Sequence, residues 1–429
     1  MSGLTSVLLS GLSGLRAAQT GLGVASQNIA NANTPGFVRT ELTLAPRTQL
    51  GEGAGVEVAG VRRAADRFLA TASYIAEATR GAASVRADVL SRAQANFGDP
   101  ASNTSVFAAL DQVWSALTEV GIDPSSALRR ADAVGALQTT YSEIQRIGQS
   151  IQGLVSEADQ RIGDAVAEAQ DLINRIASLN REIQLSKRSG ADSTGAENAQ
   201  SAMIDQLSAL MDVRATAQSE GGVHVRTSGG ALLVGVEPAR LSYTPSSAPF
   251  ATHGTIRVNE DLGTQSNLEP FLLGGELKGL LQVRDQDLPG LADALGGFAA
   301  SLADALNQAH NENASSPAVG ELIGRQTGLL ATDAHGFTGS AIIAVVDATG
   351  ALRERISIDF DARTVSTEAP AASFSFLGGE IGDLTSALNA ALAAATPAGS
   401  VNFSGGVLSL NVGAGGGLVI QQDPADPSA

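Results

Sequence analysis

Residues 28–37 read Asn-Ile-Ala-Asn-Ala-Asn-Thr-Pro-Gly-Phe, and they close a segment with a regular apolar pattern. Apolar or small residues recur there in alternating steps of four and three, at Leu4, Leu8, Gly11, Leu15, Ala18, Leu22, Ala25 and Ile29. We call this row the seam, and its spacing is typical of a helix that packs against a partner helix. Proline displaces the preceding residue from the helical region, and glycine permits a tight bend. The sequence therefore predicts a helix that ends in a turn formed by Asn31, Asn33, Thr34, Pro35, Gly36 and Phe37.

Four glycines lie inside this predicted helix, at Gly11, Gly14, Gly21 and Gly23. Each costs about 0.8–1 kcal/mol relative to alanine in a helix interior. A helix weakened in this way is marginal in water, so we expect it to become ordered when it meets a partner.

The longest regular element is predicted to begin with Asp123 as its cap and Pro124 as its first residue. Heptad positions, Ile151 and Ile162 among them, then continue without a slip to Ile183, and an unbroken helix to about Lys187 would be on the order of 95 Å long. We expect it to pack in a bundle with the shorter helices predicted before it. Self-association along its heptads is the alternative interpretation.

The fold class indicated is mainly α with an additional β domain: a long-helix bundle or coiled-coil stalk and a mostly β outer domain. The expected parts are residues 1–37, the N-terminal helix and turn, and residues 38–325, a helical stalk with a small β-hairpin part at about 221–260. Residues 326–422 form the mostly β domain, and residues 423–429 have the composition of a linker. Val56-Glu57-Val58 predicts a short strand or an extended arm after the first helix, and the next helix is predicted to start from Asp66 as its N-cap.

Composition restricts the chemistry. The net charge of −17 argues against nucleic-acid binding, because phosphate recognition needs clustered Lys and Arg. The chain has no cysteine and its four histidines are scattered, so we expect no metal and no cofactor. No apolar run is long enough for a membrane span, and no segment has the pattern of a cleavable signal.

The sequence offers no catalytic constellation. It contains no nucleophile elbow, no phosphate-binding loop and no zinc-protease motif. Asp359 and Asp361 flank Phe360 and could bind a cation, but solvated acidic residues near a turn are far commoner. We therefore expect no catalytic site and no enzyme activity.

The ten-residue stretch resembles the motif that ends the N-terminal helix in the axial proteins of the bacterial flagellum, the family of rod, hook and hook-associated proteins. Residues 274–290 and 302–310 are similar to the hook-associated members that join the hook to the filament. The resemblance implies a structural subunit of the hook–filament junction that assembles through its N-terminal heptad helix. The implied assembly interface consists of Leu4, Leu8, Leu15, Leu22 and Ile29. The turn at residues 31–37 would join an inner tubular layer to the outer domains.

The resemblance also implies the partners and the location. The partners would be further copies of the chain in a ring, hook subunits, a second junction protein on the filament side and an export chaperone. The location would be the extracellular flagellum, reached by type III export without a cleavable signal. Members of the family end in a second heptad helix, and nothing after Leu418 resembles it.

Two alternatives remain open. A rod or hook subunit would share the N-terminal motif but not normally the long helix. An adhesin or a hydrolase hosted by the β domain is a more distant possibility.

Overall fold

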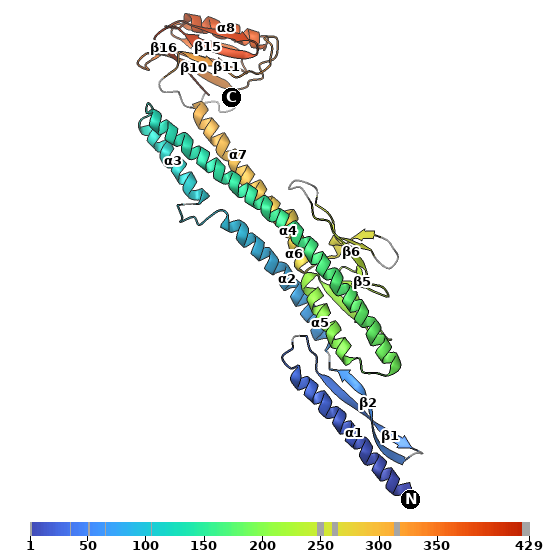
Figure 1. The fold of residues 1–429 in the computed structure, drawn as a ribbon. Helices are drawn as coiled ribbons and strands as arrows, with labels where there is room; N and C mark the ends of the chain where they lie inside the picture. The colour runs from blue at the N-terminus through green and yellow to red at the C-terminus, as the bar shows by residue number, and fades with distance from the viewer. Residues whose placement is uncertain are drawn as a thin grey trace. The chain divides into compact units, whose positions relative to one another are not determined.

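The computed structural model describes residues 2–34, 36–49, 52–64, 66–103, 105–246, 253–259, 265–312 and 318–422. It confirms the expected fold class, since a long helix and several shorter ones accompany a group of β-strands (Figure 1). Contacts divide the chain into two compact units, described separately here: Met1–Ser102 with Gln145–Ala294, and Asn103–Ile144 with Leu295–Ala429. This division differs from the expected boundaries at 37 and 325, because the helices α4 (Ala127–Ser189) and α7 (Leu288–Glu312) each contribute to both units.

The first unit begins with helix α1 (Ser2–Ala30) and an antiparallel hairpin of β1 (Thr40–Gln49) and β2 (Glu52–Arg63). The short strand or arm expected at Val56–Val58 lies within β2, but the full length of β2 and its pairing with β1 were not predicted. The hairpin extends to Thr40 because its strands pair over their whole length, with register shifts after Thr43 and Pro46 that absorb the irregular positions.

Helix α2 (Arg67–Ala95) follows the hairpin and starts at the cap that the sequence predicts. One carboxylate oxygen of Asp66 accepts hydrogen bonds from the backbone N–H groups of Phe68 and Leu69, at 2.9 and 3.2 Å. These bonds satisfy two of the donors that an α-helix leaves free at its start.

Helix α4 has 63 residues and confirms the prediction of one long helix. Its start was placed wrongly, because Asp123 ends the preceding helix α3 (Val106–Ile122) and the chain needs the next residues to reverse direction. The predicted heptad positions Ile151, Ile162 and Ile183 are at most 1% exposed within the single chain. This burial favours the bundle interpretation over self-association along α4.

Helix α5 (Thr194–Leu210) packs on α2 and leads into two three-stranded antiparallel sheets. The first sheet contains β3 (Val213–Ala217), β4 (Val223–Thr227) and β5 (Leu232–Val234). The second contains β6 (Arg240–Ser242), β7 (Arg257–Asn259) and β8 (Gln265–Asn267). The β part is therefore larger than the hairpin expected at about 221–260.

A π-helical turn interrupts the last helical segment of the first unit. After a short 3-10 turn (Glu269–Phe271) and α6 (Glu276–Gln282), residues Val283–Asp287 adopt π-helical geometry and α7 follows. Pro289, in the first turn of α7, lacks an N–H and its ring crowds the carbonyl four residues earlier. A π turn accommodates such a proline, and here it also places Arg284 in the interior.

The second unit contains α3 and a β domain with two antiparallel sheets. The larger sheet has the order β13-β12-β11-β10-β16, with β10 (Ser340–Asp347) and β11 (Leu352–Asp359) at its centre. Its remaining strands are β12 (Thr364–Glu368), β13 (Ala371–Ser375) and β16 (Gly416–Gln422). Helix α8 (Ile381–Ala394) packs against the core with side chains such as Leu388 and Leu392.

The smaller sheet has the order β14-β15-β9, from β14 (Gly399–Ser404), β15 (Val407–Val412) and β9 (Glu321–Ile323). Because β9 pairs with β15, the strands of this domain begin before residue 326, where the sequence placed its boundary. The sequence pattern missed β9, which has only three residues. Residues 423–429, expected to be linker-like, lie outside the described residues.

Candidate assembly surface

Helix α1 lies along the hairpin (Figure 1). The face that it buries consists mostly of small residues. The partly or fully buried positions of this face are Ser10, Ser13, Gly14, Ala17, Gly21, Val24 and Asn28. Ala17 is the most buried of them, with 6% of its surface exposed. A Cβ placed on Gly21 would lie 3.7 Å from Cδ2 of Leu42, so the small side chains allow the helix and the hairpin to approach closely.

The seam lies beside this buried face and is open to solvent. Each seam residue from Gly11 to Ile29 follows a buried-face residue by one position, which turns it about 100° around the helix. The exposed fractions of Leu8, Leu15, Leu22 and Ile29 are 70%, 57%, 72% and 78%. Leu4 lies within α1, but its side chain is outside the described residues.

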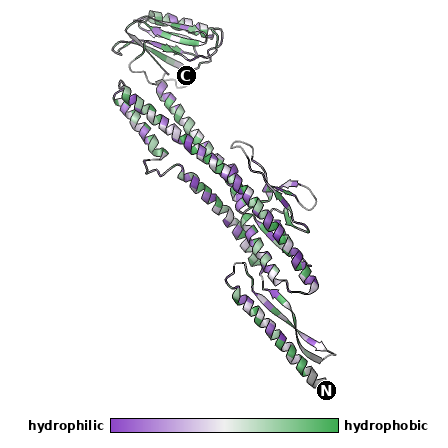
Figure 2. Cartoon of the chain, in the orientation of Figure 1, coloured by the Kyte–Doolittle hydropathy of each residue, from purple (hydrophilic) through white to green (hydrophobic). Residues whose placement is uncertain are grey.

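Further apolar side chains widen this exposed stripe. Val7, Leu9 and Leu12 are 74%, 49% and 41% exposed, and hydrophobic residues recur along the length of α1 (Figure 2). A heptad stripe of this size on a glycine-rich helix is typical of a surface that another helix covers on assembly.

Side-chain hydrogen bonds hold α1 on the hairpin. The backbone N–H of Val56 donates to Oγ of Ser13 at 3.1 Å, next to Gly55. The side-chain amide of Asn28 donates to the carbonyl of Thr40 at 2.8 Å and accepts from its N–H at 2.9 Å. The seam is thus left free by a helix whose other face is tied to the hairpin.

The described residues that follow α1 form a turn. The side chain of Asn31 donates to the carbonyl of Gln27 at 3.0 Å and accepts from the Thr34 hydroxyl at 3.4 Å. Asn33 is exposed, the N–H of Phe37 donates to the carbonyl of Thr34 at 3.1 Å, and Pro35 lies outside the described residues. Whether these residues set the angle between assembly layers stays a prediction.

Gly36 brings the turn against helix α5. Its φ of +76° favours glycine, and a Cβ there would lie 3.2 Å from Cβ of Ala202. The turn therefore needs glycine for both its backbone conformation and its close contact.

Charged groups are partly buried where the turn and the hairpin meet α5. Burial lowers the pKa of Arg63, and Glu197, Tyr74 and Asp205 oppose that shift. Burial, helped by Glu77, raises the pKa of Asp205, while Arg63 acts in the opposite direction. These shifts follow from packing at a structural joint.

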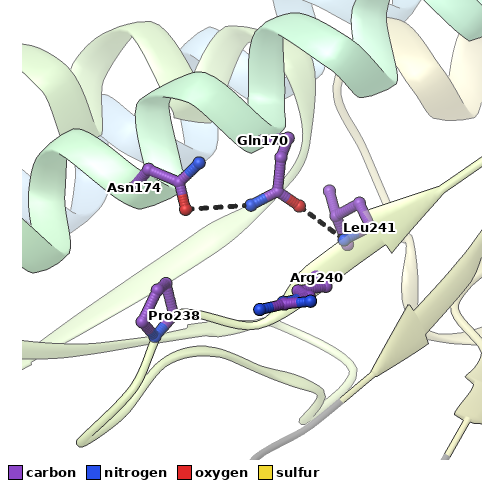
Figure 3. Close-up of a pocket in the computed structure, with 5 residues that line it drawn as sticks. All are labelled: Gln170, Asn174, Pro238, Arg240 and Leu241. Carbon is purple, nitrogen blue, oxygen red and sulfur yellow. Dashed lines mark hydrogen bonds between the residues drawn. The ribbon is translucent and has the colours of Figure 1, made fainter.

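Other parts of the described chain offer little for catalysis or metal binding. A hollow of about 390 Å³ lies between α4 and β6 and is lined by Gln170, Asn174, Pro238, Arg240 and Leu241 (Figure 3). Gln170 already spans it, because its amide accepts from the N–H of Leu241 and donates to Asn174 (Figure 3). Hydrogen bonds also occupy the acids that flank Phe360: Asp359 accepts from the N–H of Ala362 and Asp361 from that of Gly339.

The described residues contain no cluster of three or more His, Cys, Asp or Glu side chains that could hold a metal ion. No helix among them combines the length and the apolar character that crossing a membrane requires. The exposed seam is therefore the strongest candidate for a functional surface.

Comparisons with known proteins identify the family of this chain. Residues 90–321, more than half of the chain, match the family model described as flagellar hook-associated protein FlgK helical domain. Residues 8–37, which include most of the seam and the turn, match the flagella basal body rod protein model. The chain belongs to the flagellar hook-associated protein FlgK family.

Several relatives show the extent of the match. A flagellar hook-associated protein 1 from Salmonella typhimurium is 27% identical over 317 residues, which cover 72% of this chain and 57% of that protein. The Escherichia coli protein of the same name is 25% identical, with the same coverage of both chains. This chain thus spans little more than half the length of these relatives. The solved structure of the flagellar hook junction protein FlgK from Burkholderia pseudomallei is 20% identical and has a TM-score of 0.49, covering 84% of this chain and 63% of that one.

Proposed function

We propose that this chain is a non-enzymatic structural subunit of the bacterial flagellum, and that it forms part of the junction between hook and filament. The observation that carries the proposal is the exposed seam on α1, in a chain that belongs to the hook-associated family. The names of the relatives, all flagellar hook-associated protein 1, support the position at the hook.

Assembly would proceed by burial of the seam. Full burial of one Leu or Ile side chain contributes about 1.5–3 kcal/mol, and Leu8, Leu15, Leu22 and Ile29 each expose more than half of their surface. Their combined burial offsets the cost of ordering a helix that contains five glycines. Ordering of α1 is therefore coupled to contact with its neighbours.

The partners that fit this surface are other apolar helices. We assign the seam to further copies of this chain in a ring and to adjacent hook subunits, with a second junction protein on the filament side. Leu4, Leu8, Leu15, Leu22 and Ile29 form the interface in this proposal. The turn at residues 31–37 joins an inner layer to the helical stalk, and the β domain faces outward.

The proposal also includes the route and the location. The subunit would leave the cell through the type III export channel, guided by an export chaperone, and would function in the extracellular flagellum. A helix that is marginal on its own suits passage in an unfolded state.

The test is deletion of the gene in its source cell, followed by electron microscopy of the flagella and an assay of flagellin in the medium. We expect hooks without filaments and flagellin released outside, with filaments restored by the full gene. Cells without hooks would place the subunit in the rod or the hook. Intact filaments would overturn the assembly role.

A further inference from the structure

Two asparagine side chains hold the root of the β1–β2 hairpin. Asn28 of α1 bonds both backbone groups of Thr40, at 2.8 and 2.9 Å. Asn198 of α5 bonds both backbone groups of Val38: its Nδ2 donates to the carbonyl and its Oδ1 accepts from the N–H, each at 3.3 Å. Two residues of one extended segment are thus each held by a different helix.

The geometry of an antiparallel pair explains why these backbone groups are available. Successive residues of a strand direct their N–H and C=O groups to opposite edges. The carbonyl of Arg39 accepts from the N–H of Ala64 on the β2 side, at 2.9 Å, so the groups of Thr40 point to the other edge. A side-chain amide carries one acceptor and a donor, as a peptide group does, and it can replace a strand neighbour there.

Asn198 also reaches the second strand. Nε of Arg63 donates to its Oδ1 at 2.8 Å, and Arg63 is the register partner of Thr40. Thr40 is 5% exposed, so its bonds to Asn28 lie out of solvent. The two asparagines therefore connect α1, both hairpin strands and α5 within one unit.

We propose that Asn28 and Asn198 are positioning residues that fix the direction in which α1 leaves α5, and with it the direction in which the seam faces. The inference rests on the proposed role of the seam in assembly, because a fixed direction matters only if a partner must meet that face. In this role the two asparagines act through the hairpin root and not through contact with the partner.

Hydrogen–deuterium exchange on the full-length chain before assembly tests the joint itself. Asn28→Ala should speed exchange of the Thr40 amide about five- to tenfold, and Asn198→Ala should do so for the Val38 amide, since each amide loses its hydrogen-bond acceptor. Asn198→Asp removes the donor to the Val38 carbonyl but keeps the acceptor for the Val38 N–H. The Val38 amide should therefore stay protected from exchange in this variant. Asn174→Ala, an exposed asparagine in the same unit, should change neither amide.

The functional arm uses the same variants to complement a strain that lacks the gene. We expect Asn28→Ala and Asn198→Ala to reduce the number of filaments per cell several-fold, with export unchanged, and Asn174→Ala to restore filaments fully. Unchanged exchange at Thr40 and Val38 would overturn the joint. Faster exchange with normal filaments would overturn its positioning role. A seam variant that assembles normally would instead refute the proposed function and leave the exchange result standing.

Discussion

Arg284 and Asp159 form a buried ion pair in the first unit. Nη1 of Arg284 lies 3.0 Å from Oδ1 of Asp159, and the two side chains are 3% and 2% exposed. The hydroxyl of Tyr243 and the backbone N–H of Ser246 also donate to this carboxylate. The π turn at Val283–Asp287 is thereby tied to α4 and to the segment after β6.

Removal of one partner of this pair should destabilise the first unit strongly. Arg284→Met leaves the Asp159 carboxylate buried without its cation, and we expect a loss of about 3–5 kcal/mol in the free energy of unfolding. Urea denaturation measures this loss. Arg80→Met removes an exposed arginine paired with Glu77 and should cost less than about 1 kcal/mol. Equal costs for the two variants would contradict the account of the buried pair.

The same carboxylate should make stability depend on pH at the acid end. Burial alone would raise the pKa of Asp159, but hydrogen bonds from Tyr243, Ser246 and Arg284 outweigh it and lower the pKa. The folded state therefore binds its proton less readily than the unfolded state, whose aspartate pKa is about 3.9. The contribution to stability is complete well above this value and is lost as the pH falls below it. Asp159→Asn should weaken the acid dependence measured by unfolding between about pH 5 and pH 2, and an unchanged slope would contradict it.

The contact of α1 with the hairpin should depend on Gly55. Its φ is +106°, and a Cβ there would lie 2.2 Å from Oγ of Ser13. We expect Gly55→Ala to weaken this contact by about 1–2 kcal/mol or more, and exchange of the Val56 amide measures it. Gly60→Ala is the control, since Gly60 also has a positive φ but no atom within 4 Å of an added Cβ. A similar effect of both substitutions would show that backbone strain and not the approach of Ser13 limits this position.

Glycine in α1 should lower the stability of the free helix. Gly23 is exposed and an added Cβ would meet nothing within 4 Å. Gly23→Ala should therefore stabilise α1 by about 0.8–1 kcal/mol, seen as slower exchange of the neighbouring helical amides. Unchanged exchange would indicate that tertiary contacts and not helix propensity control the order of α1.

The regular elements were predictable where a periodic row of apolar residues is long and unbroken. The heptads up to Ile183 predicted α4, and the Asp66 cap predicted the start of α2. The hairpin of β1 and β2 was largely missed, because Thr, Pro and Gly interrupt its alternation and its register shifts break the period of two. The π turn was missed as well, since one proline in a helical pattern does not show how the backbone adapts.

The candidate site was predictable on one face of α1 only. The spacing of Leu8, Leu15 and Leu22 marks the seam directly. The face of α1 that packs on the hairpin is a row of small residues that ends in Asn28. Small residues do not stand out by hydrophobicity in a sequence, so this packing face was not recognised. Asn198 could not be paired with Val38 from the sequence, because 160 residues separate them.

The central claim is that the exposed seam on α1 drives assembly and does not stabilise the free subunit. The most direct measurement compares Leu15→Asp with Thr20→Asp, which places the same charge at an exposed position about 140° around the helix from Leu15. Both full-length variants would complement the gene deletion, and their melting temperatures would be measured before assembly. We predict that Leu15→Asp abolishes filaments and leaves the melting temperature within about a degree of the control, which retains filaments. Normal filaments with Leu15→Asp, or a fall of several degrees in its melting temperature, would contradict the claim.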